Sequence, residues 1–265
     1  MIKIGANSVL FADFDLETAM RHIHLAGYDG IELAAIKGSE HLELENWQAQ
    51  VNQIKELSQQ YELELLAMEV ASLEEERLMP AFAAGAEIGI PVVNIGSGGQ
   101  SDVEEDLVRQ VELVAEMAER AQEHGVTLCV KPHVGACIYN TPTILRAMEM
   151  VDSPACGINM DPSHIHRAGE NPVESFPKVA DRVKHVHIRD CAVPQGGPGT
   201  PETQACGRGD IDLFGFIRVL HESGNDLSAD LEVIGASGYD LGQVTTIAAE
   251  SRGYLHACLR ACGAR

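Results

Sequence analysis

The segment GINMDPSHIHRAGENP, residues 157–172, places an acid and two histidines directly after a short apolar run. Carboxylates and imidazoles both bind metal ions and carry protons in enzymes. Asp161, at the end of the apolar run, is therefore a candidate site residue, and His164 follows it closely. We interpret His166 as a loop residue.

Polar side chains of the same kinds stand in or just after other apolar runs. VKPHVG contains Lys131 and His133, VKHVHI contains His185 and His187, and ADLEVI contains Glu232. Residues two apart on a strand face the same side. We therefore expect Lys131 to share a face with His133, and His185 to share one with His187, with His187 nearer the strand end.

Three further polar residues follow or end apolar runs near the start of the chain. Asn7 and Glu69 are candidate substrate contacts, although a turn residue and a solvated rim residue are the simpler alternatives for them. For Glu32 we expect a solvated residue at the rim.

Eight short apolar runs alternate with helical patterns along the whole chain. Runs of this length and composition are typical of strands that are buried on both faces of a parallel sheet. The predicted strands are residues 2–6, 30–34, 64–69, 91–96, 127–131, 156–161, 183–188 and 229–234.

The segments between these strands carry helical patterns, most clearly at residues 47–63 and 103–125. In the second segment apolar residues recur at steps of three and four, and acids fill the first turn, where the helix dipole favours them. The stripe consists of Leu107, Val111, Val114 and Ala118. Gly125 supplies the left-handed residue that commonly ends a helix.

Eight strands with helices between them and no linker predict a single domain over residues 1–265, folded as one (β/α)₈ TIM barrel. A doubly wound open sheet is the alternative, but no G-x-G-x-x-G motif follows the first strand. Active sites of such barrels lie at the carboxyl ends of the strands. Asp161, His187 and Glu232 would converge there from three consecutive strands.

Three charged or polar groups that converge in a barrel mouth are costly to bury without a partner. Two carboxylates and an imidazole suit a divalent cation such as Mn²⁺, Mg²⁺, Co²⁺ or Zn²⁺. The sequence therefore predicts Asp161, His187 and Glu232 as metal ligands.

The charge balance excludes several classes of partner. Lys and Arg number 19 against 40 Asp and Glu, which gives a net charge of −21. A field of this sign repels nucleic acids and acidic membrane surfaces. No apolar stretch approaches the roughly 20 residues of a membrane helix.

The cysteines and the first residues indicate the compartment. The seven cysteines are odd in number and lack C-x-x-C spacing, which favours buried reduced thiols. The start MIKIGANSVLF does not have the pattern of a signal peptide. We therefore expect a cytoplasmic protein.

At these residues the sequence resembles the xylose-isomerase-like TIM barrels, which include ketose epimerases, hydroxypyruvate isomerase, inosose dehydratase and AP endonucleases of the endonuclease IV type. The resemblance spans almost the whole chain, through IKIGANS, AGYDGIEL, DPSH with HRAGENP, HVHIRD and CGRGDIDLFGFI. It implies a metal held by a Glu that ends the fifth strand, by Asp161, by His187 and by Glu232. It also implies that His164 lies close to substrate oxygens.

The chain departs from this pattern at the fifth strand, where Lys131 stands in place of the Glu. The two-carboxylate mechanism of the ketose epimerases therefore cannot be carried over, and the K-P-H-x-G stretch is more similar to inosose dehydratase. Lys131 could act as a base or steer an anionic substrate, and His133 is the other candidate proton carrier. Alternatively, the metal site has decayed and Lys131 replaces the charge of a lost cation.

The function that the resemblance implies is a metal-dependent isomerase or epimerase of a small sugar or cyclitol. The cation would stabilise an enediolate, while Glu232, or Lys131 with His133, moves the proton. A lyase similar to inosose dehydratase, which would eliminate water from the same intermediate, is a close alternative, and a non-catalytic or metal-less sugar-binding barrel is another. The charge argues against an AP endonuclease. The oligomeric state stays open, although homo-oligomers are common among related barrels.

Overall fold

The computed structural model describes residues 2–192 and 196–265, in which eight strands form a closed barrel in the order of the sequence. Every neighbouring pair is parallel, and β8 pairs with β1 to close the barrel. The strands are β1 (Lys3–Asn7), β2 (Gly30–Ala34), β3 (Glu64–Glu69), β4 (Val92–Gly96), β5 (Thr127–Lys131), β6 (Cys156–Met160), β7 (Val183–Ile188) and β8 (Ser228–Leu231). This confirms the predicted single (β/α)₈ barrel, and the alternative prediction of an open doubly wound sheet was wrong.

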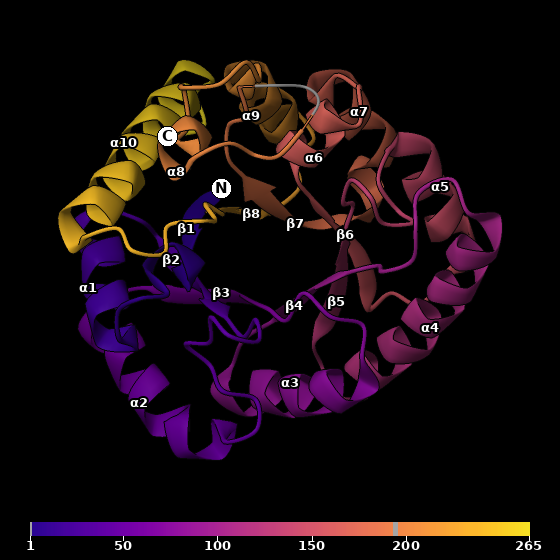
Figure 1. The fold of residues 1–265 in the computed structure, drawn as a ribbon, viewed down its shortest axis with the longest axis horizontal. Coiled ribbons are helices and arrows are strands. Elements are labelled where there is room, and N and C mark those ends of the chain that lie inside the picture. Colours follow the sequence, from indigo (N-terminus) through magenta and orange to yellow (C-terminus); the bar gives the residue numbers. More distant parts are fainter. Residues whose placement is uncertain (1, 193–195) are drawn as a thin grey trace.

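Helices form an outer ring around the strands (Figure 1). In the figure the yellow α10 lies beside the indigo α1, and contacts between these two helices join the last and first helices of the ring. The helices are η1 (Ser8–Phe11), α1 (Leu16–Leu25), α2 (Trp47–Gln60), α3 (Glu75–Ile88), α4 (Glu104–Glu123), α5 (Thr141–Met150), α6 (Pro162–Arg167), α7 (Pro172–Val179), η2 (Ala180–Arg182), α8 (Pro201–Gln204), α9 (Leu213–Glu222) and α10 (Leu241–Ala261).

Helix α4 forms where its apolar stripe and its acidic first turn predict it. The four residues of the predicted stripe are buried, and Glu104, Glu105 and Asp106 fill the first turn. Gly125 follows the helix with a φ of +71°, in the left-handed region. Helix α2 ends at Gln60, three residues before the predicted end, because Glu62 turns the chain with a φ of +52°.

The ends of β6 and β8 fall earlier than predicted. Strand β6 ends at Met160, and Asp161 is the N-cap of α6, where its side chain accepts a hydrogen bond from the backbone N–H of Ser163. An Asp cap followed by Pro162 is a strong start signal for a helix. His166 therefore lies in this short helix, and its assignment to a loop was wrong. Glu232 directly follows β8 instead of lying within it.

In the described residues, the cysteines and the helices can be compared with the expectations of buried reduced thiols and of no membrane helix. None of the seven cysteines, all of them in the described residues, forms a disulfide, and all but Cys262 are buried. Among the described residues no helix combines the length and apolar character needed to cross a bilayer.

A layer of polar side chains closes the inside of the barrel below its carboxyl end. His185 Nε2 lies 2.9 Å from Asp230 Oδ2, and His185 Nδ1 lies 3.0 Å from the amide nitrogen of Asn94 and 3.2 Å from the amide oxygen of Asn159. All four side chains are fully buried, and we call them the polar floor. The floor needs a glycine next to it: Gly5 pairs with Asp230 across β1 and β8, and a Cβ at Gly5 would collide with Asp230 Oδ1.

Replacing Gly5 by Ala should therefore destabilise the barrel by about 1–3 kcal/mol, because the added methyl group overpacks a closed interior. Urea unfolding followed by circular dichroism measures this change. Gly253→Ala is the matched control, because a Cβ at this exposed position in α10 meets no atom within 4 Å. That control should be neutral or slightly stabilising. Equal stability of the two variants would contradict the packing argument.

Candidate active site

Charged and polar side chains gather inside the barrel at the carboxyl ends of its strands. Each of them is at least nine-tenths buried, so each charge needs a partner inside the protein. We call this group the barrel-mouth cluster; its members are Asn7, Glu32, Glu69, Lys131, Asp161, His187, Arg189 and Glu232.

Lys131 lies at the centre of this cluster, at the last position of β5. Its Nζ donates hydrogen bonds to Glu69 Oε1 and to Glu232 Oε1, both at 2.6 Å. The same Nζ lies 3.4 Å from His187 Nδ1. Burial alone would lower the pKa of Lys131, but the charges of Glu232 and Glu69 outweigh it and raise this pKa above its ordinary value. Lys131 is therefore an ammonium ion and not a base.

The two carboxylates that share Lys131 differ in their surroundings. Glu232 also lies 3.2 Å from Arg189 Nη1, and the two cations hold the pKa of Glu232 well below its usual value despite burial. Burial and the charge of Glu232 raise the pKa of Glu69 to about 7. Glu232 is thus the ionised carboxylate of the pair. Its Oε2 is buried and receives no hydrogen bond from the described residues.

Within the cluster, His187 on β7 contacts Glu32 on β2 across the inside of the barrel. His187 Nε2 lies 2.7 Å from Glu32 Oε2, and amide nitrogens of Asn7 and Asn94 donate to the two oxygens of Glu32 at 2.8 and 2.6 Å. Burial would lower the pKa of His187, but Glu32 and Glu232 raise it well above the ordinary value. Glu32 is fully buried, so the expectation of a solvated rim residue was wrong. It is buried because His187 and two amides satisfy its charge.

Asn7 and Glu69, the predicted substrate contacts, lie side by side in the cluster. The amide nitrogen of Asn7 donates to Glu69 Oε2 at 2.7 Å as well as to Glu32. The amide of Asn7 therefore positions two carboxylates, and neither residue is solvated in this arrangement.

Arg189 lies between Asp161 and Glu232, two of the three predicted metal ligands. Its guanidinium lies 3.5 Å from Asp161 Oδ2 through Nη2 and 3.2 Å from Glu232 Oε2 through Nη1. Ser163 donates to Asp161 Oδ1 at 2.7 Å, and despite burial Arg189 lowers the pKa of Asp161 to about 2. The sequence reasoning missed Arg189. Strand alternation could have found it, because it lies two residues beyond His187 in HVHIRD.

His164 and His133 form a ring pair, in which His164 contacts Arg189. Their ring centroids are 4.0 Å apart, and Arg189 Nη2 lies 3.0 Å from His164 Nε2. Burial lowers the pKa of both histidines, most strongly that of His164. His133 is exposed, whereas Lys131 is buried, so the prediction that the two residues share one face of a strand was wrong. The chain has left β5 before His133.

Two groups of three side chains in the described residues have ligand atoms close enough to hold a metal ion. One group is Glu32, His185 and His187, and the other is Glu69, His187 and Glu232. The predicted ligands His187 and Glu232 thus come together, while Asp161 belongs to neither group and stays a prediction.

The contacts in both groups test whether a divalent cation fits. In the second group, Lys131 Nζ approaches all three members at 2.6, 2.6 and 3.4 Å, so the ammonium already stands between the ligand atoms. In the first group both ring nitrogens of His185 face partners in the polar floor. The residues as arranged fit an internal ammonium ion and do not fit an added metal.

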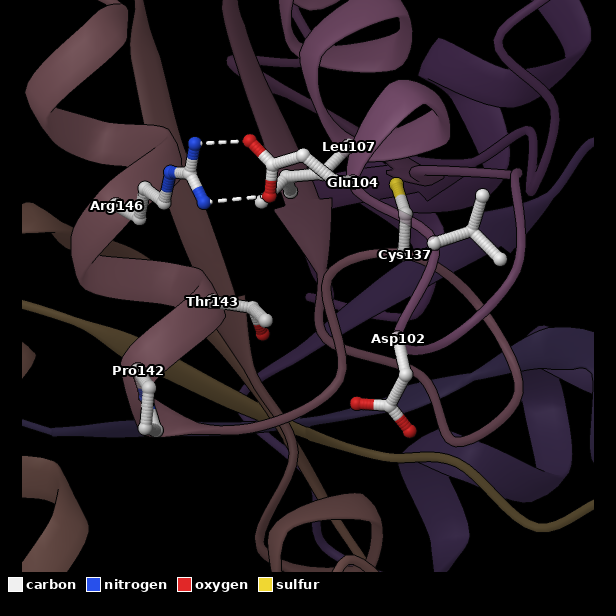
Figure 2. A pocket seen from close by; sticks show the side chains of 8 residues that line it. Asp102, Glu104, Leu107, Cys137, Pro142, Thr143 and Arg146 are labelled. Carbon is white, nitrogen blue, oxygen red and sulfur yellow. Dashed lines mark hydrogen bonds and ion pairs between the residues drawn. The ribbon is translucent and has the colours of Figure 1, made fainter.

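A surface cavity of about 280 Å³ lies apart from this cluster, between residues 102–107 and 137–146. Figure 2 shows Arg146 facing the Glu104 carboxylate across two dashed contacts. Asp102, at the other side of the cavity, accepts a hydrogen bond from Tyr139 at 2.6 Å. None of the residues lining this cavity belongs to the barrel-mouth cluster, and its Arg146 is already paired with Glu104.

Comparison with known proteins agrees with this barrel. Residues 20–258 match the family model described as xylose isomerase-like TIM barrel. An inosose dehydratase of Lacticaseibacillus casei is 32% identical over 74 residues, which are 28% of this chain and 25% of that protein. An inosose dehydratase of Clostridium beijerinckii is 33% identical over 70 residues, 26% and 24% of the two chains. The matches thus span about a quarter of the length of these relatives.

Solved structures resemble the barrel over nearly their whole length. A D-tagatose 3-epimerase-like protein has a TM-score of 0.77 at 21% identity, covering 99% of both chains. The probable 3-DHS dehydratase of Bacillus anthracis has a TM-score of 0.76 at 16% identity, covering 97% of this chain and 99% of that one. At these identities the likeness concerns the fold.

Replacing Arg189 by Met should destabilise the protein by about 3–5 kcal/mol, because two buried carboxylates lose their shared cation. Chemical denaturation monitored by tryptophan fluorescence and circular dichroism measures this loss. The matched control is Arg146→Met, which breaks the ion pair with Glu104 between side chains that are 48% and 59% exposed. The control should cost no more than about 1 kcal/mol. A small loss in both variants would mean that Arg189 does not neutralise the buried carboxylates.

Proposed function

This chain belongs to the xylose isomerase-like TIM barrel family, and on that premise we propose that it is an enzyme that moves a proton next to the carbonyl of a keto-sugar or keto-cyclitol. The observation that carries the proposal is the pairing of one ionised carboxylate, Glu232, with two cations, Lys131 and Arg189, at the carboxyl end of the barrel. A base beside fixed positive charge is what enolisation requires.

In the proposed reaction Glu232 takes the proton from the carbon next to the substrate carbonyl. The electron pair of the broken C–H bond moves onto the carbonyl oxygen, and the Lys131 ammonium or the Arg189 guanidinium stabilises the resulting enediolate. Glu232 then returns the proton to the former carbonyl carbon. The hydroxyl proton of the first carbon passes to the former carbonyl oxygen, so the carbonyl group now stands on the first carbon and the isomerisation is complete. His164 and His133 lie beside Arg189 and are proposed to contact the substrate hydroxyls.

This site suits a reaction in which one carboxylate moves the proton on one face of the substrate. It is less suited to a reaction in which Glu69 and Glu232 exchange a proton from opposite faces of one carbon. One oxygen of Glu69 and one oxygen of Glu232 lie within 4.8 Å of each other. A carbon that reacts with both would need each oxygen at about 3 Å or more on opposite sides, which requires roughly 6 Å between them. We therefore propose isomerisation ahead of epimerisation.

Dehydration is the second candidate, and the stretches shared with proteins named inosose dehydratase favour it. The first half of the reaction is the same. In the second half a hydroxyl group on the carbon beyond the enediolate leaves as water, with a proton supplied by an acid of the site. Glu69, whose pKa is raised to about 7, is the carboxyl suited to that role.

The metal-dependent form of the reaction, with Asp161, His187 and Glu232 as ligands, is the alternative that the resemblance implies. It requires the Lys131 ammonium to leave the position between Glu69 and Glu232. A sugar-binding barrel without catalysis is the other alternative, and it requires that no proton exchange occur.

Incubation with a panel of ketoses, aldoses and inososes in D₂O should distinguish these reactions. We expect deuterium to be incorporated at the carbon next to the carbonyl without loss of water, as measured by NMR and mass spectrometry. A product lighter by one water would establish the dehydratase instead. Binding of a panel member without any exchange or turnover would reject the enzymatic proposal.

Glu232→Gln should lower the turnover of the substrate found in that panel by roughly 10²–10⁴-fold, because the amide cannot accept the proton. The fold should persist, which circular dichroism checks. Glu250→Gln serves as the matched control, since Glu250 lies on the outer helix α10 in an ion pair with Arg208. Full activity in Glu232→Gln would assign the base to another group.

A further inference from the structure

We infer that the Lys131 ammonium, assisted by Arg189, takes the place of a divalent cation in this barrel, so that the protein binds no metal between Glu69, His187 and Glu232. The inference concerns which cation the site carries, and it does not depend on the substrate or reaction proposed above.

The position of the ammonium carries the argument. Glu69, His187 and Glu232 are the group whose ligand atoms come together, and a metal bound by them would sit between those atoms. Lys131 Nζ occupies that place, at 2.6 Å from each carboxylate and 3.4 Å from the imidazole nitrogen. A metal ion and this ammonium therefore compete for one position.

Each carboxylate around Lys131 already has a cationic partner without a metal. Glu32 is paired with His187 at 2.7 Å, and Asp161 lies 3.5 Å from Arg189. Glu69 and Glu232 share Lys131, and Arg189 adds a second cation to Glu232 at 3.2 Å. A dication would have to enter against two fixed positive charges, and like charges in a poorly solvated site repel strongly.

The ammonium can also serve a substrate, because Lys has three N–H donors. Two of them are used by Glu69 and Glu232 in short hydrogen bonds. Among the residues that the structure describes, the third N–H has only the 3.4 Å approach to His187 Nδ1, so it is the donor available to a substrate oxygen. Lys131 thus offers one directed hydrogen bond where a metal would offer open coordination positions.

The test replaces the Lys131 ammonium by a carboxylate that can bind a metal. Full-length protein is dialysed against EDTA and titrated with Mn²⁺ by calorimetry, and bound manganese is counted after desalting. Lys131→Glu removes the ammonium and adds a carboxylate between Glu69, His187 and Glu232. We expect no binding by the unmodified protein at millimolar Mn²⁺. Lys131→Glu should bind one Mn²⁺ per chain, with a dissociation constant at least about tenfold below that millimolar range.

Lys178→Glu is the matched control, because it makes the same charge change on the exposed side of α7 and should leave Mn²⁺ binding as in the unmodified protein. Lys131→Met removes the ammonium without adding a ligand, so it should bind Mn²⁺ more weakly than Lys131→Glu but better than the unmodified protein. It also preserves the test if Lys131→Glu does not fold.

Two results would overturn the inference. The first is stoichiometric Mn²⁺ binding by the unmodified protein that Glu232→Gln abolishes. The second is a folded Lys131→Glu that gains no metal. Neither measurement uses a substrate, so a failure of the proposed isomerisation would not be mistaken for either result. If the D₂O panel yields a substrate, turnover by the unmodified protein should also be unchanged by EDTA.

Discussion

The structure of the barrel mouth depends on one shared contact, the Lys131 ammonium held between Glu69 and Glu232. Two carboxylates this close repel each other, and burial strengthens the repulsion because little water screens it. The ammonium between them makes the arrangement stable, and Arg189 extends the same neutralisation to Asp161. The remaining acid, Glu32, is held by His187 and the amides of Asn7 and Asn94. Every carboxylate in the cluster therefore has a cationic neighbour, although Lys131 and Arg189 are each shared by two carboxylates.

The fold allows these charges to be buried together because it brings oppositely charged residues from distant parts of the chain to one end of a closed sheet. Glu69 ends β3, Lys131 ends β5 and Glu232 follows β8, so three segments far apart in sequence meet around one nitrogen. Below them the polar floor closes the interior, and its Asp230 has space only because Gly5 lacks a side chain. The polar floor below the barrel-mouth cluster thus depends on the absence of a side chain at Gly5.

The sequence predicted the barrel and most of the residues at its mouth, because strand ends and side-chain alternation follow from local patterns. It predicted that His187 and Glu232 converge together with Asp161, and the structure places His187 Nδ1 3.5 Å from Glu232 Oε2. It did not predict how far a long side chain reaches, so the position of Arg189 between Asp161 and Glu232 was missed. It also placed Glu32 in solvent, because the burial of a carboxylate depends on partners from other strands that no local pattern reveals.

An ammonium and a metal ion impose different demands on the base beside them. A metal draws its carboxylate ligands into coordination bonds, which lowers their basicity at the moment when a proton must be accepted. Lys131 and Arg189 also hold the pKa of Glu232 low, but Lys131 donates a hydrogen bond to Oε1 alone. Oε2 lies 3.2 Å from Arg189 Nη1 and receives no hydrogen bond from the described residues. Glu232 can therefore stay anchored through Oε1 while Oε2 accepts a proton. The ammonium polarises a carbonyl less than a dication does, so the site should favour substrates whose C–H bond is already acidified by a neighbouring ketone.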